Sequence, residues 1–252
     1  ATYRAAFEAE GLPVVKDIQY DPEQTDVAEI VGPMLAAEPD VLCWCTSYTP
    51  MVHAMTEYAY EQGFKGRILS CTLDNYERIV ARTSETFMEG TLFQFPDFDD
   101  PKLARKAFFF NKPSAFFKEY NARYPGTWSA VSWEYVAILE IWHAAVEKVA
   151  SVNPVSVLTT MKQMEPVTHA FGPARWWGEH MFGIDNALIG DWPVVHLREG
   201  RARIAEFLSV PDWLDRHEEL LRDHMGRVGQ LWQQRVKMGE HQTGLTAREI
   251  ID

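Results

Sequence analysis

The pattern of hydrophobic and polar positions is clearest between Pro39 and Tyr76. A short apolar run at residues 41–45 is followed by a polar corner, an amphipathic stretch that ends near Gly63, and a second apolar run at residues 68–71. The amphipathic stretch has apolar residues at helical spacing and carries Pro50 at its start, where the missing N–H costs nothing. Two buried strands joined by one helix form a βαβ unit, so the pattern predicts a parallel sheet.

The residues before this unit continue the alternation of helix and strand. Residues 1–11 have the pattern of an amphipathic helix with Gly11 as its C-cap, and residues 12–20 are rich in β-branched side chains, which predicts a strand. Thr25 or Asp26 caps the next helix. A helix followed by a strand normally has a strand before it, so we expect a leading portion ahead of residue 1.

A further strand is predicted directly after Gly90, at residues 91–96. The first 96 residues therefore alternate between helix and strand, which is typical of an α/β fold with helices on both faces of a parallel sheet.

The pattern changes after Asp97. The acidic segment 97–102 lacks the alternating oxygen ligands and central glycine of a calcium loop, so we expect a solvated turn. Residues 102–124 have a helical pattern that Pro113 should break or kink. A long helix is predicted at 129–151, and another follows Pro154.

The last third of the chain has two recognisable patterns. Residues 192–197 and 202–207 flank a short turn and predict a β-hairpin. From Pro211 onward apolar residues recur at helical spacing, which predicts one long amphipathic helix, or two that meet near Gly226 and Gly229.

Composition narrows the classes of partner. The chain has 252 residues, 46% of them hydrophobic, and a formal net charge of −12. Without a basic run, this charge argues against binding to nucleic acid or to an anionic membrane surface. No apolar run approaches the roughly 20 residues of a membrane-spanning helix.

Three cysteines cannot form a complete disulfide framework. Cys43 and Cys45 lie two apart on one strand, so their side chains share a face and are badly placed to bond each other. Cys45 and Cys71 can face each other if their strands are neighbours. The favoured interpretation is that all three are buried free thiols that act as small apolar groups.

Polar side chains stand directly after the predicted strands, at positions where a buried core would contain apolar residues. In α/β sheets ligands bind beyond the carboxyl ends of the strands. Turn capping is the alternative for the hydroxyls, helix capping for Asp74, and core packing for Phe95. The candidate ligand-binding residues are Thr46, Ser47, Tyr48, Thr72, Asp74 and Phe95.

Motifs of catalysis, metal binding and cofactor binding are missing from the sequence. It has no H-E-x-x-H, no G-x-S-x-G, no P-loop and no G-x-G-x-x-G, and its eight histidines show no metal-ligand spacing. We therefore predict no catalytic residue, no metal site and no cofactor.

The order of elements resembles the branched-chain amino-acid-binding (Leu/Ile/Val-binding) family, which supplies substrate-binding proteins to ABC importers and has the type I periplasmic-binding-protein fold. The resemblance covers about residues 1–205. Three departures are Val136 in place of an aspartate, the absence of the first-lobe half and of the second lobe's first strand, and the tail after Pro211. The matching residues are the segment 11–15, Thr25-Asp26, Pro39-Asp40-Val41, Tyr48 with Pro50, Gly63, Glu89-Gly90, Phe116 or Phe117 with Tyr120 and Tyr124, and Tyr135.

The resemblance implies two α/β lobes that close on a ligand by hinge motion. Residues 1–126 would belong to the second lobe, 127–188 to the returning part of the first lobe and 189–205 to the crossover, with 206–252 as a C-terminal helical extension. Tyr48 and the loop after Ser70 would line the cleft. In relatives an acid in that second loop receives the ligand's ammonium group, and Asp74 is the nearest candidate here.

The function implied by the resemblance is capture of a small polar ligand, such as an amino acid, amide or organic acid, for a membrane permease, in the periplasm or outside the cell. The missing lobe segment would be a partner. Two alternatives stay open: a sensor or receptor of the same fold, whose C-terminal helix contacts a partner or a second copy, and a doubly wound enzyme. The simplest interpretation of that helix is that it packs on its own chain.

Overall fold

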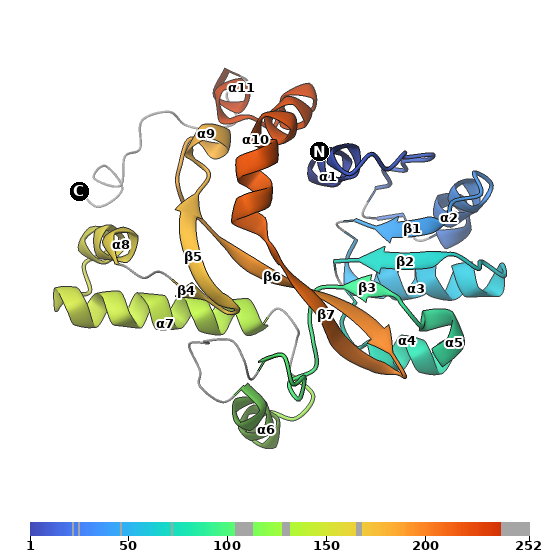
Figure 1. The fold of residues 1–252 in the computed structure, drawn as a ribbon, viewed down its shortest axis with the longest axis horizontal. Helices are drawn as coiled ribbons and strands as arrows, with labels where there is room; N and C mark the ends of the chain where they lie inside the picture. Colours follow the sequence, from blue (N-terminus) through green and yellow to red (C-terminus); the bar gives the residue numbers. More distant parts are fainter. Residues whose placement is uncertain are drawn as a thin grey trace.

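The computed structural model describes residues 1–21, 23–24, 26–45, 47–71, 73–103, 113–127, 132–164 and 168–237. Its fold is a mixed α/β fold with helices on both sides of a twisted sheet (Figure 1). The helices are α1 (Thr2–Ala9), α2 (Val27–Leu35), α3 (Thr49–Glu61), α4 (Tyr76–Arg82), α5 (Glu85–Met88), α6 (Pro113–Arg123), α7 (Ser132–Val149), α8 (Pro154–Gln163), α9 (Glu179–Phe182), α10 (Val210–Arg227) and α11 (Trp232–Lys237). The strands are β1 (Val41–Trp44), β2 (Arg67–Ser70), β3 (Leu92–Phe93), β4 (Thr168–His169), β5 (Gly172–Trp177), β6 (Ala187–Arg198) and β7 (Arg201–Ser209).

The predicted βαβ unit is confirmed. β1 and β2 pair in parallel, with Trp44 level with Ser70, and β2 pairs in parallel with β3. The side chains of Leu42 and Trp44 point to the same face of the sheet, where they pack with Val52 of α3 in the main core. The carboxyl ends of the three parallel strands therefore lie at one edge of the sheet.

β6 joins two parts of the sheet. Its first half pairs antiparallel with β5, and its second half pairs antiparallel with β3. β7 folds back along most of β6, and Glu199 and Gly200 turn the chain with positive φ angles of 51° and 68°, as two-residue hairpin turns favour. The predicted hairpin is confirmed, and one long strand runs through both parts of the molecule (Figure 1).

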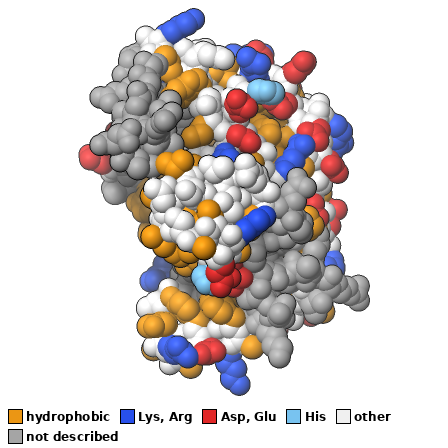
Figure 2. All heavy atoms as spheres, turned by 90° about the vertical axis from the view of Figure 1, so that its left-hand side faces the viewer, with side chains coloured by type: hydrophobic (Ala, Val, Ile, Leu, Met, Phe, Trp, Pro, Cys, Tyr) orange, Lys and Arg blue, Asp and Glu red, His pale blue; other side chains and the backbone are white. Residues whose placement is uncertain are grey.

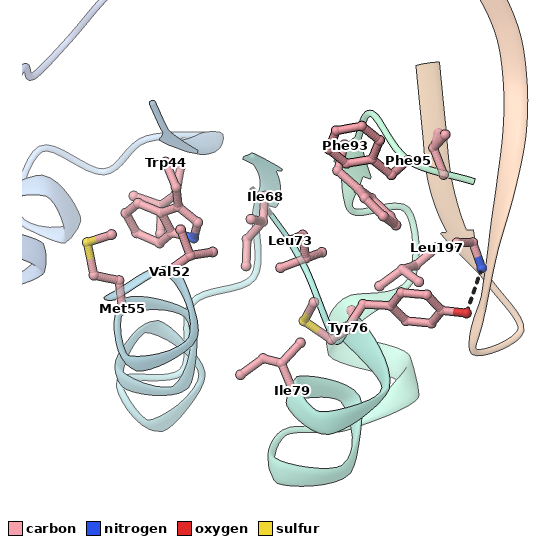
Figure 3. Close-up of a cluster of buried hydrophobic side chains, with 14 of the residues drawn as sticks. Trp44, Val52, Met55, Ile68, Leu73, Tyr76, Ile79, Phe93, Phe95 and Leu197 are labelled. Atoms are coloured by element: carbon pink, nitrogen blue, oxygen red, sulfur yellow. Dashed lines mark hydrogen bonds between the residues drawn. The ribbon is translucent and has the colours of Figure 1, made fainter. Parts of the chain in front are cut away.

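The main hydrophobic core lies between the parallel strands and the helices α3 and α4 (Figure 3). Burial of each large apolar side chain contributes roughly 1.5–3 kcal/mol. Tyr76 stands at the margin of this core, where its hydroxyl accepts the Ala202 N–H at 3.3 Å and donates to Asp97 Oδ1 at 2.7 Å. The Tyr76 hydroxyl thereby links β7 to the segment that follows β3.

The acidic segment that follows β3 is more than a solvated turn. Asp100 is 4% exposed and accepts the Ile204 N–H at 2.8 Å, while Arg201 bonds both Asp97 and Asp99. The expectation of a solvated turn is therefore wrong for Asp97 and Asp100. Their side chains fasten the turn to β7, a partner more than a hundred residues away that no local pattern indicates.

The strand predicted at residues 12–20 does not form. β1 is the end strand of the described sheet, and residues 12–20 make no pairing with it. Leu12, Val14 and Val15 are 47–58% exposed, whereas Ile18 and Tyr20 pack against the main core, so only the end of the segment covers apolar surface. A strand needs backbone hydrogen bonds to a neighbouring strand, and residues 12–20 make none with the described strands.

The C-terminal helices pack on their own chain. Leu214 and Leu221 of α10 form a small core with Ala5 of α1 and Met181 of α9. The predicted amphipathic pattern is confirmed as two helices, with the break between Arg227 and Trp232. Within the part of the chain that the structure describes, no helix has the length and apolar character to cross a bilayer.

Candidate functional site

The candidate site consists of the loops that leave the carboxyl ends of β1, β2 and β3. Ser47 and Tyr48 follow β1, Asp74 follows β2, and Phe95 follows β3. The predicted residues Thr46 and Thr72 lie outside the described residues. The topology thus brings four of the predicted residues to one edge of one sheet, because parallel strands end on the same side.

Ser47 is tied to the segment ahead of α2. The hydroxyl of Tyr20 donates a hydrogen bond of 2.8 Å to Ser47 Oγ. The Ser47 N–H also points back to the carbonyl of Cys45, which closes a tight turn after β1. The loop after β1 is therefore held by the side chain of Tyr20, which lies outside the sheet.

Tyr48 occupies the N-cap position of α3. Its backbone is extended, with φ −78° and ψ 155°, and its side chain makes no capping bond. The side chain is 49% exposed although large aromatic groups are usually mostly buried. An exposed phenol beside a helix N-terminus offers both an apolar face and a hydroxyl to a ligand.

The loop after β2 is organised by His53 of α3. The ring Nε2 of His53 lies 2.8 Å from the Asp74 carbonyl oxygen, and His53 itself is buried. The next residue, Asn75, stands at the N-cap position of α4 in a left-handed conformation with φ 55° and makes no side-chain capping bond. Asn tolerates this conformation better than most residues. Backbone bonding therefore fixes where Asp74 stands, while its side chain remains partly exposed.

The loop after β3 points into the core. Phe95 is 5% exposed, and its ring packs edge-on against Trp192 with centroids 6.4 Å apart. The neighbouring Gln94 side chain donates to the Cys71 carbonyl at 2.7 Å, so it connects the ends of β2 and β3. Phe95 thus has a packing role within the described residues.

Three cysteines lie in or directly after the parallel strands: Cys43 in β1, Cys45 after β1 and Cys71 after β2. Cys43 Sγ and Cys45 Sγ are 3.4 Å apart, and all three cysteines are free and partly exposed. The hydrogen bond between the two thiols lowers the pKa of Cys45, while the same bond and burial raise the pKa of Cys43. Burial and a hydrogen bond with Cys71 raise the pKa of the Tyr3 hydroxyl.

Sequence reasoning missed three residues that hold these loops: Tyr20, His53 and Gln94. Each acts on a loop at least 21 positions away in the sequence. The available signals were a polar group on the buried face of a helix for His53 and a polar group at the end of an apolar run for Gln94. Neither signal identifies the partner.

Two hollows lie elsewhere on the molecule. One of about 640 Å³ is bounded by α1, the segment 11–17 and His224 of α10, and one of about 530 Å³ lies between α10 and α11. The strand-end residues line neither of them. The described residues also contain no group of three or more potential metal ligands.

The fold of this chain is similar to that of several solved structures. A leucine-binding protein from Thermotoga maritima is 18% identical with a TM-score of 0.61, over 83% of this chain and 56% of that one. The leucine-, isoleucine-, valine-, threonine- and alanine-binding protein from Brucella ovis is 15% identical with a TM-score of 0.61, over 82% and 53%. A solute-binding protein from R. palustris in complex with benzoate is 14% identical with a TM-score of 0.60, over 81% and 53%.

The chain spans about half the length of these structures. No curated protein matches it. The family described as periplasmic binding protein matches residues 1–202, which is most of the chain. Its fold agrees with the type I fold that the order of elements predicts. The chain is a member of the periplasmic binding protein family.

Proposed function

We propose that this chain carries ligand-holding loops of a solute-binding protein that captures a small polar ligand for an ABC permease in the membrane. The observation that carries the proposal is the meeting of Ser47, Tyr48 and Asp74 at the carboxyl edge of three parallel strands. Ligands of open α/β sheets bind beyond this edge. The ligand class is an amino acid, an amide or a related organic acid, held by hydrogen bonds and an aromatic face.

We propose the lobe boundaries that the resemblance implies: residues 1–126 in the second lobe, 127–188 in the first, 189–205 as the crossover and 206–252 as an extension. The pairing of β6 with β5 at one end and with β3 at the other supports a crossover near its middle. A strand shared by two parts of a fold is a suitable hinge, because a small change in its twist moves one part relative to the other.

A further polypeptide segment is proposed as a partner. On α7, Ile138, Leu139 and Trp142 are 46–64% exposed, and Val155 and Leu158 of α8 are also exposed. Figure 2 looks at this side of the molecule and shows hydrophobic side chains open to solvent. An apolar helix face usually marks an interaction surface. The part of the relatives' fold that this chain does not match is the proposed occupant.

A homodimer through the C-terminal helices stays a prediction. The apolar face of α10 is already packed against α1 and α9, which favours the interpretation that the helix stabilises its own chain. A sensor or receptor role is the alternative that keeps the fold and changes the partner. The family consists of binding proteins, so we expect no turnover of the captured compound. Its members are typically periplasmic, and we propose that location for this protein.

Calorimetric titration with leucine and with benzoate tests the proposal. Tyr48→Ala should weaken binding by about five-fold or more, since it removes an exposed aromatic contact of roughly 1–3 kcal/mol. Tyr60→Ala is the matched control, because Tyr60 is exposed at the opposite end of α3. Equal effects of both variants, or no heat of binding with either compound, would count against the proposed ligand-holding loops.

A further inference from the structure

The pair Cys43 and Cys45 has a short sulfur–sulfur distance, a shared side of the chain and partial exposure to solvent. The two residues stand on the same side of the chain at the end of β1, and their sulfur atoms are 3.4 Å apart. Trp44, between them, points to the opposite face, where it is 2% exposed and donates to Thr56 Oγ1 at 3.0 Å. Both cysteines are partly exposed, so a reagent can reach them.

The backbone allows the two sulfurs to approach further. Residues two apart in a strand have Cα atoms about 6.6 Å apart, which is near the upper end of the roughly 4.4–6.8 Å seen in disulfides. The pairing of β1 with β2 ends at Trp44 and Ser70, so Cys45 is not fixed by the strand ladder. The structure brings the two sulfur atoms closer than strand spacing alone indicates.

The two thiols are not equivalent in reactivity. The bond from the Cys43 thiol stabilises the thiolate of Cys45 and lowers its pKa, and the pKa of Cys43 is raised. Thiolates are the nucleophiles in thiol–disulfide exchange. Cys45 lies beyond the last pair of the β1–β2 ladder and is the thiol with the lowered pKa, so it is suited to be the attacking group and Cys43 to be the resolving group. Cys71 differs from both, because its thiol is engaged by Tyr3 of α1.

We propose that Cys43 and Cys45 form a redox-active dithiol that is oxidised by low-molecular-weight disulfides. The Cys45 thiolate attacks one sulfur of the reagent disulfide, forms a mixed disulfide and releases one reagent thiolate. The Cys43 thiol then loses its proton to solvent and attacks Cys45 Sγ, which releases the second reagent thiolate. The protein pair loses two electrons, and the reagent disulfide gains them as two thiols.

The bond would act on the loop that follows β1. Cys45 precedes Thr46, and its carbonyl accepts the Ser47 N–H, while Ser47 is held by Tyr20. Drawing Cys45 toward Cys43 therefore changes the turn that carries Ser47 and Tyr48. The dithiol lies at the edge where we place ligand binding, but its chemistry does not depend on that assignment.

Oxidised glutathione followed by alkylation and peptide mass mapping tests the proposal. Trypsin leaves Cys43 and Cys45 on one peptide, because no Lys or Arg lies between Lys16 and Lys65, whereas Cys71 falls on another. We expect the first peptide to lose both alkylation sites and two hydrogens, and the Cys71 peptide to be alkylated in full. Alkylation of all three thiols, or a link between Cys71 and either other cysteine, would overturn the proposal.

Two variants define the order of events. Cys43→Ser keeps a hydroxyl beside Cys45 but removes the resolving thiol, so we expect glutathione to remain attached to Cys45. Cys71→Ser should behave like the wild type. Loss of the mixed disulfide in Cys43→Ser would contradict the assigned roles. If that variant does not fold, the peptide map of the wild-type protein decides alone. Protein unfolded in urea is then the control, and we expect it to show no preference for the Cys43–Cys45 link.

Discussion

The hydroxyl of Tyr20 lies 2.8 Å from Ser47 Oγ, and this contact joins a segment outside the sheet to the loop after β1. Residues 12–20 pair with no strand among the described residues, so side chains such as Tyr20 hold this segment in place. The contact gives a direct physical connection between the N-terminal segment and the candidate site.

Tyr20→Phe should lower the free energy of unfolding by about 0.5–1.5 kcal/mol, because one partly buried hydrogen bond is lost. Urea unfolding followed by circular dichroism measures this change. Tyr60→Phe is the control, since Tyr60 is exposed at the far end of α3. A loss no larger than that of the control would show that the contact does not hold the segment.

Thr56 connects the core to β1 through its hydroxyl, which accepts from Trp44 Nε1 at 3.0 Å and donates to the Val52 carbonyl at 2.7 Å. Thr56→Val leaves a buried indole N–H without this acceptor, and we expect a loss of about 1–3 kcal/mol in unfolding free energy. Thr56→Ser retains the hydroxyl and should lose less. Thr56→Val keeps a methyl group in place, so a free energy of unfolding equal to that of the wild type would show that the hydrogen bond does not contribute.

Gly190 in β6 is required by a close approach of His169. A Cβ at this position would lie 2.0 Å from His169 Nε2 and 2.5 Å from the Pro173 carbonyl. Gly190→Ala should therefore destabilise the protein by roughly 1–3 kcal/mol through overpacking. Gly32→Ala in α2 meets no atom within 4 Å and should be neutral or slightly stabilising, because alanine favours helix. Thermal unfolding of both variants checks the contrast, and equal melting temperatures would refute it.

The ion pairs of Asp99 predict a small acid sensitivity. A hydrogen bond from Arg203 lowers the pKa of Asp99 below its usual value of about 3.9. The folded form binds this proton less readily than the unfolded chain, so the stabilisation is complete above that usual value and is lost as the pH falls through the lower folded pKa. Asp99 is largely exposed, so screening by solvent keeps the effect below about 1 kcal/mol.

Asp99→Asn should accordingly flatten the decline of stability between neutral and acidic pH and reduce its dependence on salt. Unfolding by urea at pH 7 and pH 3, at low and high salt, measures both effects. A decline identical to that of the wild type at both salt concentrations would show that these ion pairs contribute nothing.

Much of the fold was predictable because its patterns are local. The alternation around α3 and the turn at residues 198–201 carry their own signals, in the spacing of apolar residues and in the residues of a tight hairpin. The strand predicted at 12–20 was wrong for a non-local reason: whether a β-branched run pairs depends on how distant segments pack, and residues 12–20 pair with no described strand.

The candidate site was predictable in position but not in detail. The rule that ligands bind beyond the carboxyl ends of parallel strands selects Ser47, Tyr48 and Asp74 without any knowledge of the residues that pack around them. It could not reveal that Tyr20 and His53 hold these loops, because such contacts depend on how distant segments pack. The burial of Phe95 against Trp192 has the same origin, since the two residues are brought together only by the pairing of β3 with β6.

A native mass spectrum of the protein as purified, compared with its denatured mass, tests the central claim most directly. We predict a small adduct that is released on denaturation in the wild type, and a clear loss of that adduct in Tyr48→Ala while Tyr60→Ala retains it. The mass of the adduct would also identify the ligand class. A wild-type spectrum without any adduct, or an adduct equally retained by Tyr48→Ala, would contradict the assignment of ligand binding to the strand-end loops.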